Sequence, residues 1–459
     1  MLKGLWRAQS LTSKYAYHRP VPVVRQLITL AIETSCDDTS VAVLETARQD
    51  GSSQDQKAAI LHFHEKVTAD NARFRGVHPI VALESHNKQL APLVAKALRN
   101  CPSPDQRSPS ISIRAQSGWL EKTKPDFISV TRGPGMLSSL NTGLNTAKGL
   151  ATAWQVPLVG VNHMQAHALT PRLVHALETE NNEQLPPKFP FLTLLVSGGH
   201  TMLVHSKALT HHAILANTMD IAIGDCIDKM ARHILPAGLI EDSAEMMYGR
   251  LLEHFAFPNG PSDHGYIAPR TRAEDLSQKP SIWGWALTAP LSRTRSGSRS
   301  KDMAFSFAGL GSAIERICHR IEKAMTLDER RDVAREAFRV AFEHLASRVL
   351  MALQQLKIAE TADTEEMGTL VVSGGVASNR FLRTVLRSFL DIRGFAHIRL
   401  VFPPTSLCTD NAAMIAWTGT EMYKAGYETD LSCGALRKWS IDPSAESGGI
   451  LGVDGWRMK

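Results

Sequence analysis

Two histidines four residues apart, His163 and His167, have the spacing in this chain that most directly suggests chemistry. On a helix, this spacing places both imidazoles on one face, one turn apart. Two neutral imidazoles can hold a divalent transition metal when a third ligand comes from elsewhere. A zincin peptidase carries Glu directly after the first His as its general base, and here that residue is Met164. The pair also has an ordinary explanation, because a chain with 18 histidines will often place two of them four apart by chance.

Carboxylates that could join this chemistry lie far away in the sequence. Asp410 precedes an apolar helix expected over 411–423 and is the best candidate for a third ligand, although N-capping alone would explain it. A His2Asp site leaves open positions for a phosphate or carbonyl oxygen and suits zinc, iron or manganese. Asp37 and Asp38 follow an apolar run near the start of the chain. Adjacent acids there can act as a general base or hold a metal through water, or they can simply polarise a turn.

Two glycine-rich turns follow apolar runs, Ser197-Gly198-Gly199 and Ser373-Gly374-Gly375. Glycine allows the backbone to approach a ligand, and exposed N–H groups in such turns bind phosphate. One such turn is usually only a turn, but two at equivalent places in two lobes predict a nucleotide held between the lobes. Asp228, near the start of a helix, is a candidate for hydrogen bonds to ribose hydroxyls, or else a carboxylate favoured by the helix dipole.

The surrounding pattern predicts an α/β protein with two related lobes. Apolar β-prone runs flank polar turns at 27–44 and again at 191–204, about 160 residues later, and a third such run covers 370–372. Helical patterns cover 80–98, with His86 and Lys88 on its polar side, and also 138–154, 330–356 and 411–423. Small residues in the second of these helices, including Gly143, allow tight backbone packing.

We therefore expect a first lobe over 27–177, a linker over 178–190, a second lobe over 191–425 and a tail over 426–459. Insertions at about 101–124 and 258–301 are rich in Ser, Pro, Gly or Arg, which favours exposed loops rather than strands. The basic end of the second insertion, 293–301, could touch phosphates or simply be solvated.

Composition bounds the class of protein. At 459 residues the chain should form more than one lobe, and 43% hydrophobic with 21% charged residues is typical of a globular protein. No apolar run approaches the length of a membrane-spanning helix. The six cysteines contain no C-x-x-C pair and fit neither a disulfide scaffold nor a zinc ribbon, which favours a reducing compartment.

Residues 1–26 are basic and contain no acidic side chain, which predicts a mitochondrial transit peptide or, alternatively, a basic tail that binds an acidic partner. The 51 basic residues less the five of this leader leave 46, against 45 acidic residues, so the body is almost neutral. A nucleic-acid enzyme would then need a local basic stripe or a partner subunit. Candidates for such a stripe are Lys88, Arg99, Arg132 and 293–301.

Seven ordered segments together resemble the tRNA N6-adenosine threonylcarbamoyltransferase family, once called O-sialoglycoprotein endopeptidases, and the leader suggests its mitochondrial branch. The segments are L-A-I-E-T-S-C-D-D-T, N-H-M-Q-A-H, L-L-V-S-G-G-H-T, G-D-C-I-D-K, F-S-F-A-G-L, V-S-G-G-V-A-S-N-R and C-T-D-N-A-A-M-I-A-W.

The resemblance implies an actin-like, sugar-kinase-like (ASKHA) fold of two ribonuclease-H-like lobes with the active site in the cleft between them. It implies transfer of a threonylcarbamoyl group from threonylcarbamoyl-AMP, supplied by a separate synthase, to N6 of adenosine 37 in ANN-decoding mitochondrial tRNAs. It also implies a homodimer in the matrix with one divalent metal ion per subunit, zinc or iron, and no membrane contact. The implied metal ligands are His163, His167 and Asp410. The implied acyl-adenylate contacts are Leu195, Val196, Ser197, Gly198, Gly199, Asp228, Gly249, Ser373, Gly374, Gly375 and Asn379.

Three departures from the family pattern weaken parts of that assignment. The family's Pro-Gly-Gly-Pro loop is not intact, and Gly249 is its nearest match. Asp38 stands where the family has Glu, and Gly311 stands where it has Lys. Two other functions stay open, an ATP-dependent kinase or chaperone of the same fold and a non-catalytic scaffold that binds tRNA or protein. Kinases of this fold hold Mg2+ through carboxylates, so the histidine pair speaks against the first.

Overall fold

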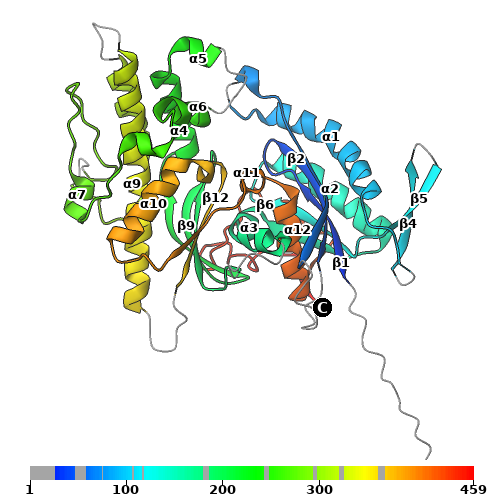
Figure 1. Cartoon of the computed structure of the whole chain (residues 1–459). Helices are drawn as coiled ribbons and strands as arrows, with labels where there is room; N and C mark the ends of the chain where they lie inside the picture. Colours follow the sequence, from blue (N-terminus) through cyan, green and yellow to red (C-terminus); the bar gives the residue numbers. More distant parts are fainter. Residues whose placement is uncertain are drawn as a thin grey trace, which may run out of the picture.

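The computed structural model describes residues 26–46, 58–74, 76–105, 108–115, 118–178, 186–241, 248–292, 297–319, 325–359 and 367–459. Two mixed β-sheets stand side by side with helices between and around them (Figure 1). The predicted transit peptide lies outside the described residues except for Gln26. Among the described helices, none combines the length and the apolar character that a membrane crossing requires.

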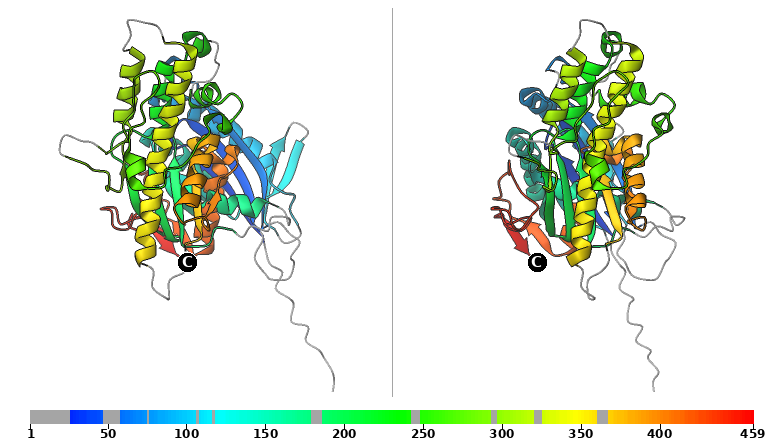
Figure 2. Two further views of the ribbon diagram at one scale, coloured as in Figure 1. Left: turned by 60° about the vertical axis from the view of Figure 1, so that its left-hand side comes forward. Right: turned by 90° about the vertical axis from the view of Figure 1, so that its left-hand side faces the viewer.

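The first sheet begins with the predicted hairpin. β1 (Leu27–Glu33), β2 (Asp38–Thr46) and β3 (Ala59–Thr68) form an antiparallel meander. β6 (Phe127–Gly133) then pairs parallel with β1, and β7 (Leu158–Asn162) pairs parallel with β6. Strands of the C-terminal tail, β14 (Tyr427–Thr429) and β15 (Trp456–Met458), extend this sheet beyond β7. They are drawn in orange and red in Figure 2.

The second sheet repeats this topology. β8 (Phe191–Val196), β9 (Thr201–Ala208) and β10 (His211–Thr218) form an antiparallel meander. β12 (Thr369–Ser373) pairs parallel with β8, and β13 (Arg399–Val401) pairs parallel with β12. The short β11 (Ala304–Phe305) joins the other edge. The strand order β10-β9-β8-β12-β13 therefore matches β3-β2-β1-β6-β7. This correspondence confirms the predicted pair of related lobes.

Helices cover both faces of each sheet. α1 (Pro79–Arg99) and α2 (Leu137–Trp154) pack on the outer face of the first sheet. α3 (His163–Leu177) and α12 (Ala412–Lys424) lie between the two sheets, in a core that takes side chains from both. On the outer face of the second sheet lie α4 (Ile223–Ile234), α6 (Gly249–Ala256), α8 (Ala308–His319), α9 (Leu327–Ala359) and α10 (Arg380–Ile392). α12 falls within the range predicted for the second lobe, 191–425, but it packs against the first sheet because its apolar residues face β1 and β2.

The remaining elements are short. They are β4 (Ser110–Ala115), β5 (Gly118–Thr123), α5 (Ala237–Glu241), α7 (Arg272–Leu276), α11 (Thr405–Cys408) and the 3-10 turns Ala72–Phe74, Pro261–His264 and Gly375–Ser378. The expectation that 101–124 contains no strands was wrong, because β4 and β5 form a hairpin. The alternation Ser-Ile-Ser-Ile at 110–113 was the strand signal.

The predicted exposure of two polar side chains was also wrong. His86 is fully buried in α1, where its ring nitrogens contact Thr39 Oγ1 at 2.8 Å and the Cys36 carbonyl oxygen at 2.9 Å. Arg132, a candidate for an RNA-binding stripe, is buried, and its Nε donates to the Gly434 carbonyl oxygen at 2.8 Å. Both side chains are therefore part of the packed interior, where both ring nitrogens of His86 have partners but the buried Nη1 of Arg132 has none.

Candidate functional site

The helix that carries the histidine pair begins at His163 because the preceding residue caps it. Asn162 has extended backbone angles, and its Oδ1 accepts from the backbone N–H groups of Met164 and Gln165. This is the standard action of Asn at an N-cap. β7 ends at the same residue, so the sheet and the cap together fix where His163 starts.

Asp410 reaches both imidazoles from the short segment between α11 and α12. Its Oδ1 lies 3.1 Å from His167 Nε2 and 3.3 Å from His163 Nε2. The N-cap of α12 is Asn411, whose Oδ1 accepts from the Met414 N–H at 3.0 Å. Asp410 is therefore not the cap we had considered, and its carboxylate is free to face the histidines.

The donor set fits a divalent metal. Metal bonds of the usual length to imidazole nitrogen and carboxylate oxygen place neighbouring ligand atoms about 3.0–3.4 Å apart. Here the Nε2 atoms of both histidines lie at that spacing from Asp410 Oδ1, and both histidines are buried. A second possible group, His233, Glu315 and His319, lies more exposed on α4 and α8.

Glu33 holds His163 from behind. This fully buried carboxylate lies 3.2 Å from His163 Nδ1, and it also accepts from the Ser35 N–H and the Thr131 hydroxyl. When Nδ1 carries the proton, Nε2 is unprotonated, and its lone pair faces Asp410 and can bind a metal. Carboxylates in this position commonly fix the tautomer of a metal-binding histidine.

At this junction, the histidine and the carboxylates each favour the charged form of their neighbours. Burial opposes protonation of His163, but Asp410 and Glu33 outweigh it and raise the pKa of His163 well above its usual value. Burial likewise opposes ionisation of Asp410, but His163 outweighs it and lowers the Asp410 pKa well below its usual value. A cation at this place is therefore strongly favoured by the two carboxylates.

The acidic turn after β1 lies next to this junction. Asp38 is buried and paired with Lys66 at 2.9 Å, and the Thr68 hydroxyl also donates to it. Burial nevertheless raises the pKa of Asp38. Lys66 Nζ also donates to Thr409 Oγ1 at 3.0 Å, one residue before Asp410. Asp37 accepts from Asn71 Nδ2 at 3.1 Å. The Asp37 carboxylate thus has no cationic partner among the described residues.

The two Ser-Gly-Gly turns lie in one lobe, not in equivalent places in two. β8 and β12 are neighbouring parallel strands, with Ser373 in register with Leu195. A Cβ on Gly374 would lie 2.4 Å from the Val196 carbonyl oxygen, so the second turn packs directly on the first strand. The repeat of the β8 turn in the first lobe is instead the acidic turn after β1. The expected arrangement was therefore wrong, because Ser373–Gly375 lies at the end of β12, which corresponds to β6 of the first lobe and not to β1.

The first of these turns has an open backbone. Gly198 and Gly199 are exposed, and a Cβ on either would meet no atom within 4 Å. The N-terminus of α4 closes one side, because Gly224 N–H donates to the Ser197 carbonyl oxygen at 3.1 Å. Open backbone N–H groups beside a helix N-terminus favour phosphate.

The other predicted nucleotide contacts surround α4 and α10. Asp228 Oδ1 accepts from the Gly249 N–H at 2.8 Å, so these two predicted residues are in contact. Burial raises the pKa of Asp228 to about 6. Asn379 caps α10, with its Oδ1 accepting from the Leu382 N–H at 3.0 Å. Leu195 and Val196 are buried strand residues that can offer a ligand only their backbone.

Two residues were not among the predicted site residues. Glu33 ends a buried strand, and an acid at a fully buried position is the signal that could have found it. His200 follows the first glycine turn, and its N–H donates to Ser197 Oγ at 3.0 Å. Burial, together with His163 and His167, lowers the pKa of His200 to about 4, so this imidazole is neutral and lies close to the metal ligands.

Two lobes of one topology, with candidate metal ligands and an open glycine turn where they meet, define a protein of the actin-like, sugar-kinase-like class. A family model described as TsaD, tRNA N6-adenosine threonylcarbamoyltransferase, matches residues 61–417. The chain belongs to this family of transferases, as the seven segments implied.

Individual relatives agree with this assignment. A Schizosaccharomyces pombe protein named tRNA N6-adenosine threonylcarbamoyltransferase, mitochondrial, is 39% identical over 440 residues, which cover 95% of this chain and 90% of that protein. A Danio rerio protein of the same name is 30% identical over 437 residues, covering 94% and 89%. Among solved structures, T. kodakarensis HypF is 13% identical with a TM-score of 0.42, over 88% of this chain and 48% of that one. The fold assignment rests on the strand orders and the family match.

Proposed function

We propose that this protein transfers the threonylcarbamoyl group from threonylcarbamoyl-AMP to N6 of adenosine 37 in ANN-decoding mitochondrial tRNAs and releases AMP. The observation that carries the proposal is the meeting of His163, His167 and Asp410 next to the Ser197–His200 turn. This places a metal-type donor set beside a phosphate-type backbone, which is what an acyl-adenylate would use. The family membership supplies the reaction.

In the reaction, N6 of the adenine attacks the carbamoyl carbon, the bond from that carbon to the phosphate oxygen breaks, and AMP leaves. The substrate is already activated, so the protein needs to position it, stabilise charge and accept the N6 proton. The backbone N–H groups of 197–199 would hold the phosphate, and Asp228 with Gly249 would border the ribose. A divalent metal, zinc or iron, would supply Lewis-acid stabilisation of a phosphate or carbonyl oxygen when bound by His163, His167 and Asp410.

Asp37 is our candidate for accepting the N6 proton, directly or through water. Its neighbour Asp38 is engaged by Lys66 and Thr68, whereas Asp37 has only the neutral amide of Asn71. A carboxylate without a cationic partner is the better base of the two. Asp38 would then position the turn rather than react.

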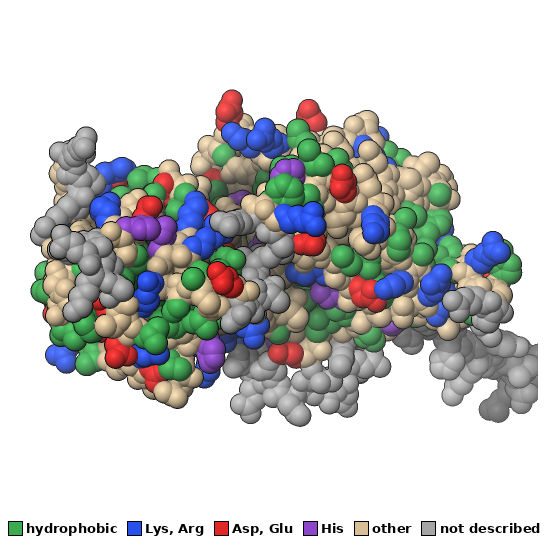
Figure 3. All heavy atoms as spheres, turned by 90° about the horizontal axis from the view of Figure 1, so that it is seen from above, with side chains coloured by type: hydrophobic (Ala, Val, Ile, Leu, Met, Phe, Trp, Pro, Cys, Tyr) green, Lys and Arg blue, Asp and Glu red, His purple; other side chains and the backbone are tan. Residues whose placement is uncertain are grey.

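The tRNA, the homodimer, the separate synthase and the mitochondrial matrix are part of this proposal. The relatives named mitochondrial support the location. In the face seen from above, Lys and Arg side chains are interspersed with Asp and Glu (Figure 3). A partner subunit or the second copy would then contribute to RNA binding, with Lys88 and Arg99 as exposed contacts from α1.

Reconstitution tests the proposal directly. Purified protein, synthetic threonylcarbamoyl-AMP and a mitochondrial tRNA transcript should yield the modified nucleoside by mass spectrometry. His163→Ala should lose both bound metal and product. His319→Ala, in the exposed second group of potential ligands, is the matched control and should keep both. Full product formation by a metal-free His163→Ala would contradict the proposed site.

The same assay separates the alternative functions. A kinase or chaperone of this fold would consume ATP without threonylcarbamoyl-AMP and leave the tRNA unmodified. A scaffold would bind tRNA without turnover.

A further inference from the structure

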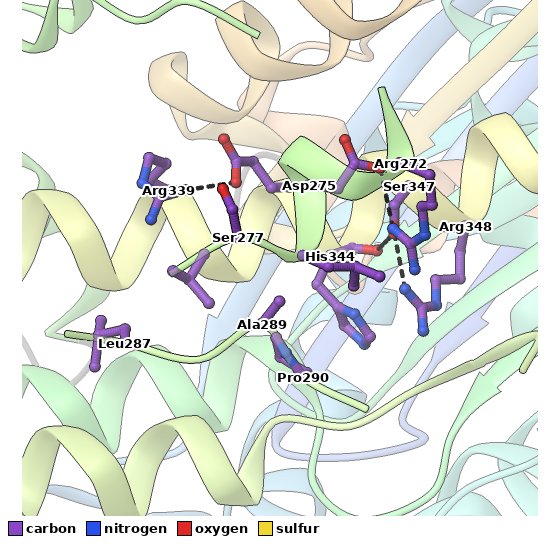
Figure 4. A pocket seen from close by; sticks show the side chains of 13 residues that line it. Arg272, Asp275, Ser277, Leu287, Ala289, Pro290, Arg339, His344, Ser347 and Arg348 are labelled. Atoms are coloured by element: carbon purple, nitrogen blue, oxygen red, sulfur yellow. Dashed lines mark hydrogen bonds and ion pairs between the residues drawn. The ribbon is translucent and has the colours of Figure 1, made fainter. Parts of the chain in front are cut away.

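A second pocket lies between the insertion and α9, on the outer side of the second lobe. Figure 4 shows it from close by, with Arg272 and Arg348 beside Ser347. An adjoining cavity of about 210 Å3 shares Arg272, Asp275 and Ser347 with it. The walls of this larger cavity also include Lys301, Gln354 and Arg393. α7 lies at the outer edge of this lobe, whereas α3 and α11 lie near the centre of the molecule (Figure 1). The pocket is thus separate from the candidate active site.

The charges of this pocket do not balance. Arg272 and Arg393 each pair with the same carboxylate, Asp275, at 3.1 Å. Lys301 is exposed at the rim. Arg348, which is only 1% exposed, lines the adjoining smaller pocket and not this cavity. In the larger cavity, three cations therefore share one carboxylate.

The hydrogen bonds of Arg348 go to neutral oxygens. Its Nε donates to the Ala304 carbonyl oxygen at 3.1 Å, and its Nη1 donates to Ser347 Oγ at 2.8 Å. The other acid that acts on it, Asp302, is paired with Arg299 at 2.6 Å. Burial and Arg272 lower the pKa of Arg348 to about 10, so the guanidinium is still charged at neutral pH.

The neighbouring histidine does not offset this charge. His344 is fully buried, and burial together with Arg348 and Arg272 keeps its pKa well below the usual value. Its Nε2 accepts from the Ser306 N–H at 3.2 Å, as a neutral ring can. Arg348 thus adds positive charge next to the cavity, with Asp302 and Asp275 as the acids that act on it. Guanidinium groups match phosphate oxygens in pairs.

We propose that the larger cavity binds a small anion of the phosphate class, held by Arg272, Lys301 and Arg393. The cavity is large enough for such an anion, and its rim residue Lys301 belongs to the basic end of the insertion noted in the sequence. The same chemistry is presented by free inorganic phosphate and by a phosphate of an RNA backbone. The inference does not rest on the proposed catalytic function.

Binding of inorganic phosphate to the full chain, measured by isothermal titration calorimetry in chloride buffer at constant ionic strength, tests the proposal. Lys301→Glu should remove a saturable component or weaken it by about tenfold or more, as expected for loss of a charge-assisted hydrogen bond. Arg270→Ala, an exposed arginine two residues from Arg272, is the matched control and should bind as the wild type does. Phosphate bound at the 197–199 turn would be insensitive to either change.

Arg393→Lys tests a guanidinium of the cavity wall while keeping its charge, and circular dichroism checks that the variant folds. It should also weaken phosphate binding, because the paired donors of guanidinium are lost. A measurement of tRNA binding distinguishes the two possible sources of the anion, an RNA phosphate and free phosphate. If the anion is an RNA phosphate, saturating phosphate and Lys301→Glu should each weaken tRNA binding. If it is free phosphate, tRNA binding should stay unchanged. Absence of saturable phosphate binding, or equal affinity in Lys301→Glu and Arg270→Ala, would overturn the proposal.

Discussion

Replacement of Glu33 by Gln should weaken metal binding although Glu33 is not a proposed ligand. One carboxylate oxygen accepts from the Ser35 N–H at 2.6 Å, and the other faces His163 Nδ1 at 3.2 Å and the Thr131 hydroxyl. Gln keeps the shape but offers only one oxygen. If that oxygen stays with Ser35, the amide NH2 faces His163 Nδ1 and favours the tautomer with the proton on Nε2. A protonated Nε2 cannot bind the metal.

The expected size of this effect follows from the loss of such a supporting carboxylate, typically 10–100-fold in metal affinity, or about 1.4–2.8 kcal/mol. The pH dependence should change as well. Glu33 helps to raise the pKa of His163, so metal binding to the wild type displaces a proton and weakens as pH falls. In Glu33→Gln the His163 pKa is lower, fewer protons are released, and affinity should depend less steeply on pH.

Zinc affinity, measured by competition with a chromophoric chelator between pH 6 and 8, reports both quantities. Glu45→Gln is the matched control, because Glu45 is also buried and holds a histidine, His62, at 2.5 Å near the far end of β2. It should bind zinc as the wild type does. Wild-type affinity together with a wild-type pH slope in a folded Glu33→Gln variant would refute the reasoning.

Three further predictions concern the turns and α4. Asp37→Asn should slow single-turnover transfer by about 100-fold or more while adenylate binding stays intact, and an unchanged rate would remove Asp37 from the mechanism. Burial raises the pKa of Asp228 to about 6, so its ionised form lowers stability above that pH. Asp228→Asn should therefore increase the free energy of unfolding by about 1–2 kcal/mol at pH 8, with a gain that shrinks toward pH 4, and it should weaken AMP binding. No gain in denaturant titrations at pH 8 would argue against this. Gly374→Ala should cost more than about 3 kcal/mol, because φ is +100° and the Cβ would meet the Val196 carbonyl oxygen. Gly394→Ala, with φ of +82° and open space around it, should cost about 1 kcal/mol, and equal losses in thermal unfolding would contradict the steric argument.

Short-range sequence patterns determined most elements of this protein. Alternating and continuous apolar runs predicted β1–β2 and β8–β9, and their recurrence predicted two related lobes. The i, i+4 spacing placed His163 and His167 on one face of α3, because helical periodicity is local. The family was also identifiable from the sequence, because seven short segments kept their order.

Sequence patterns failed where a residue's environment depends on distant segments. His86 has the spacing of a polar-face residue, but Thr39 and the Cys36 carbonyl fill its hydrogen-bonding positions, so it is buried. The α12 pattern is apolar on most sides and does not say which sheet it covers. The two glycine turns are alike in sequence, and only the pairing of β12 with β8 shows that they end neighbouring parallel strands.

The amino-acid sequence alone determined which groups are available for chemistry, because donor type and helical spacing are properties of the local chain. Only the tertiary structure decided that Asp410 meets both imidazoles, that Glu33 faces His163 Nδ1 and that Arg348 is buried. The physical reason is that ligand geometry and desolvation depend on how the lobes pack. The strength of an electrostatic interaction depends on that packing as much as on the charges themselves.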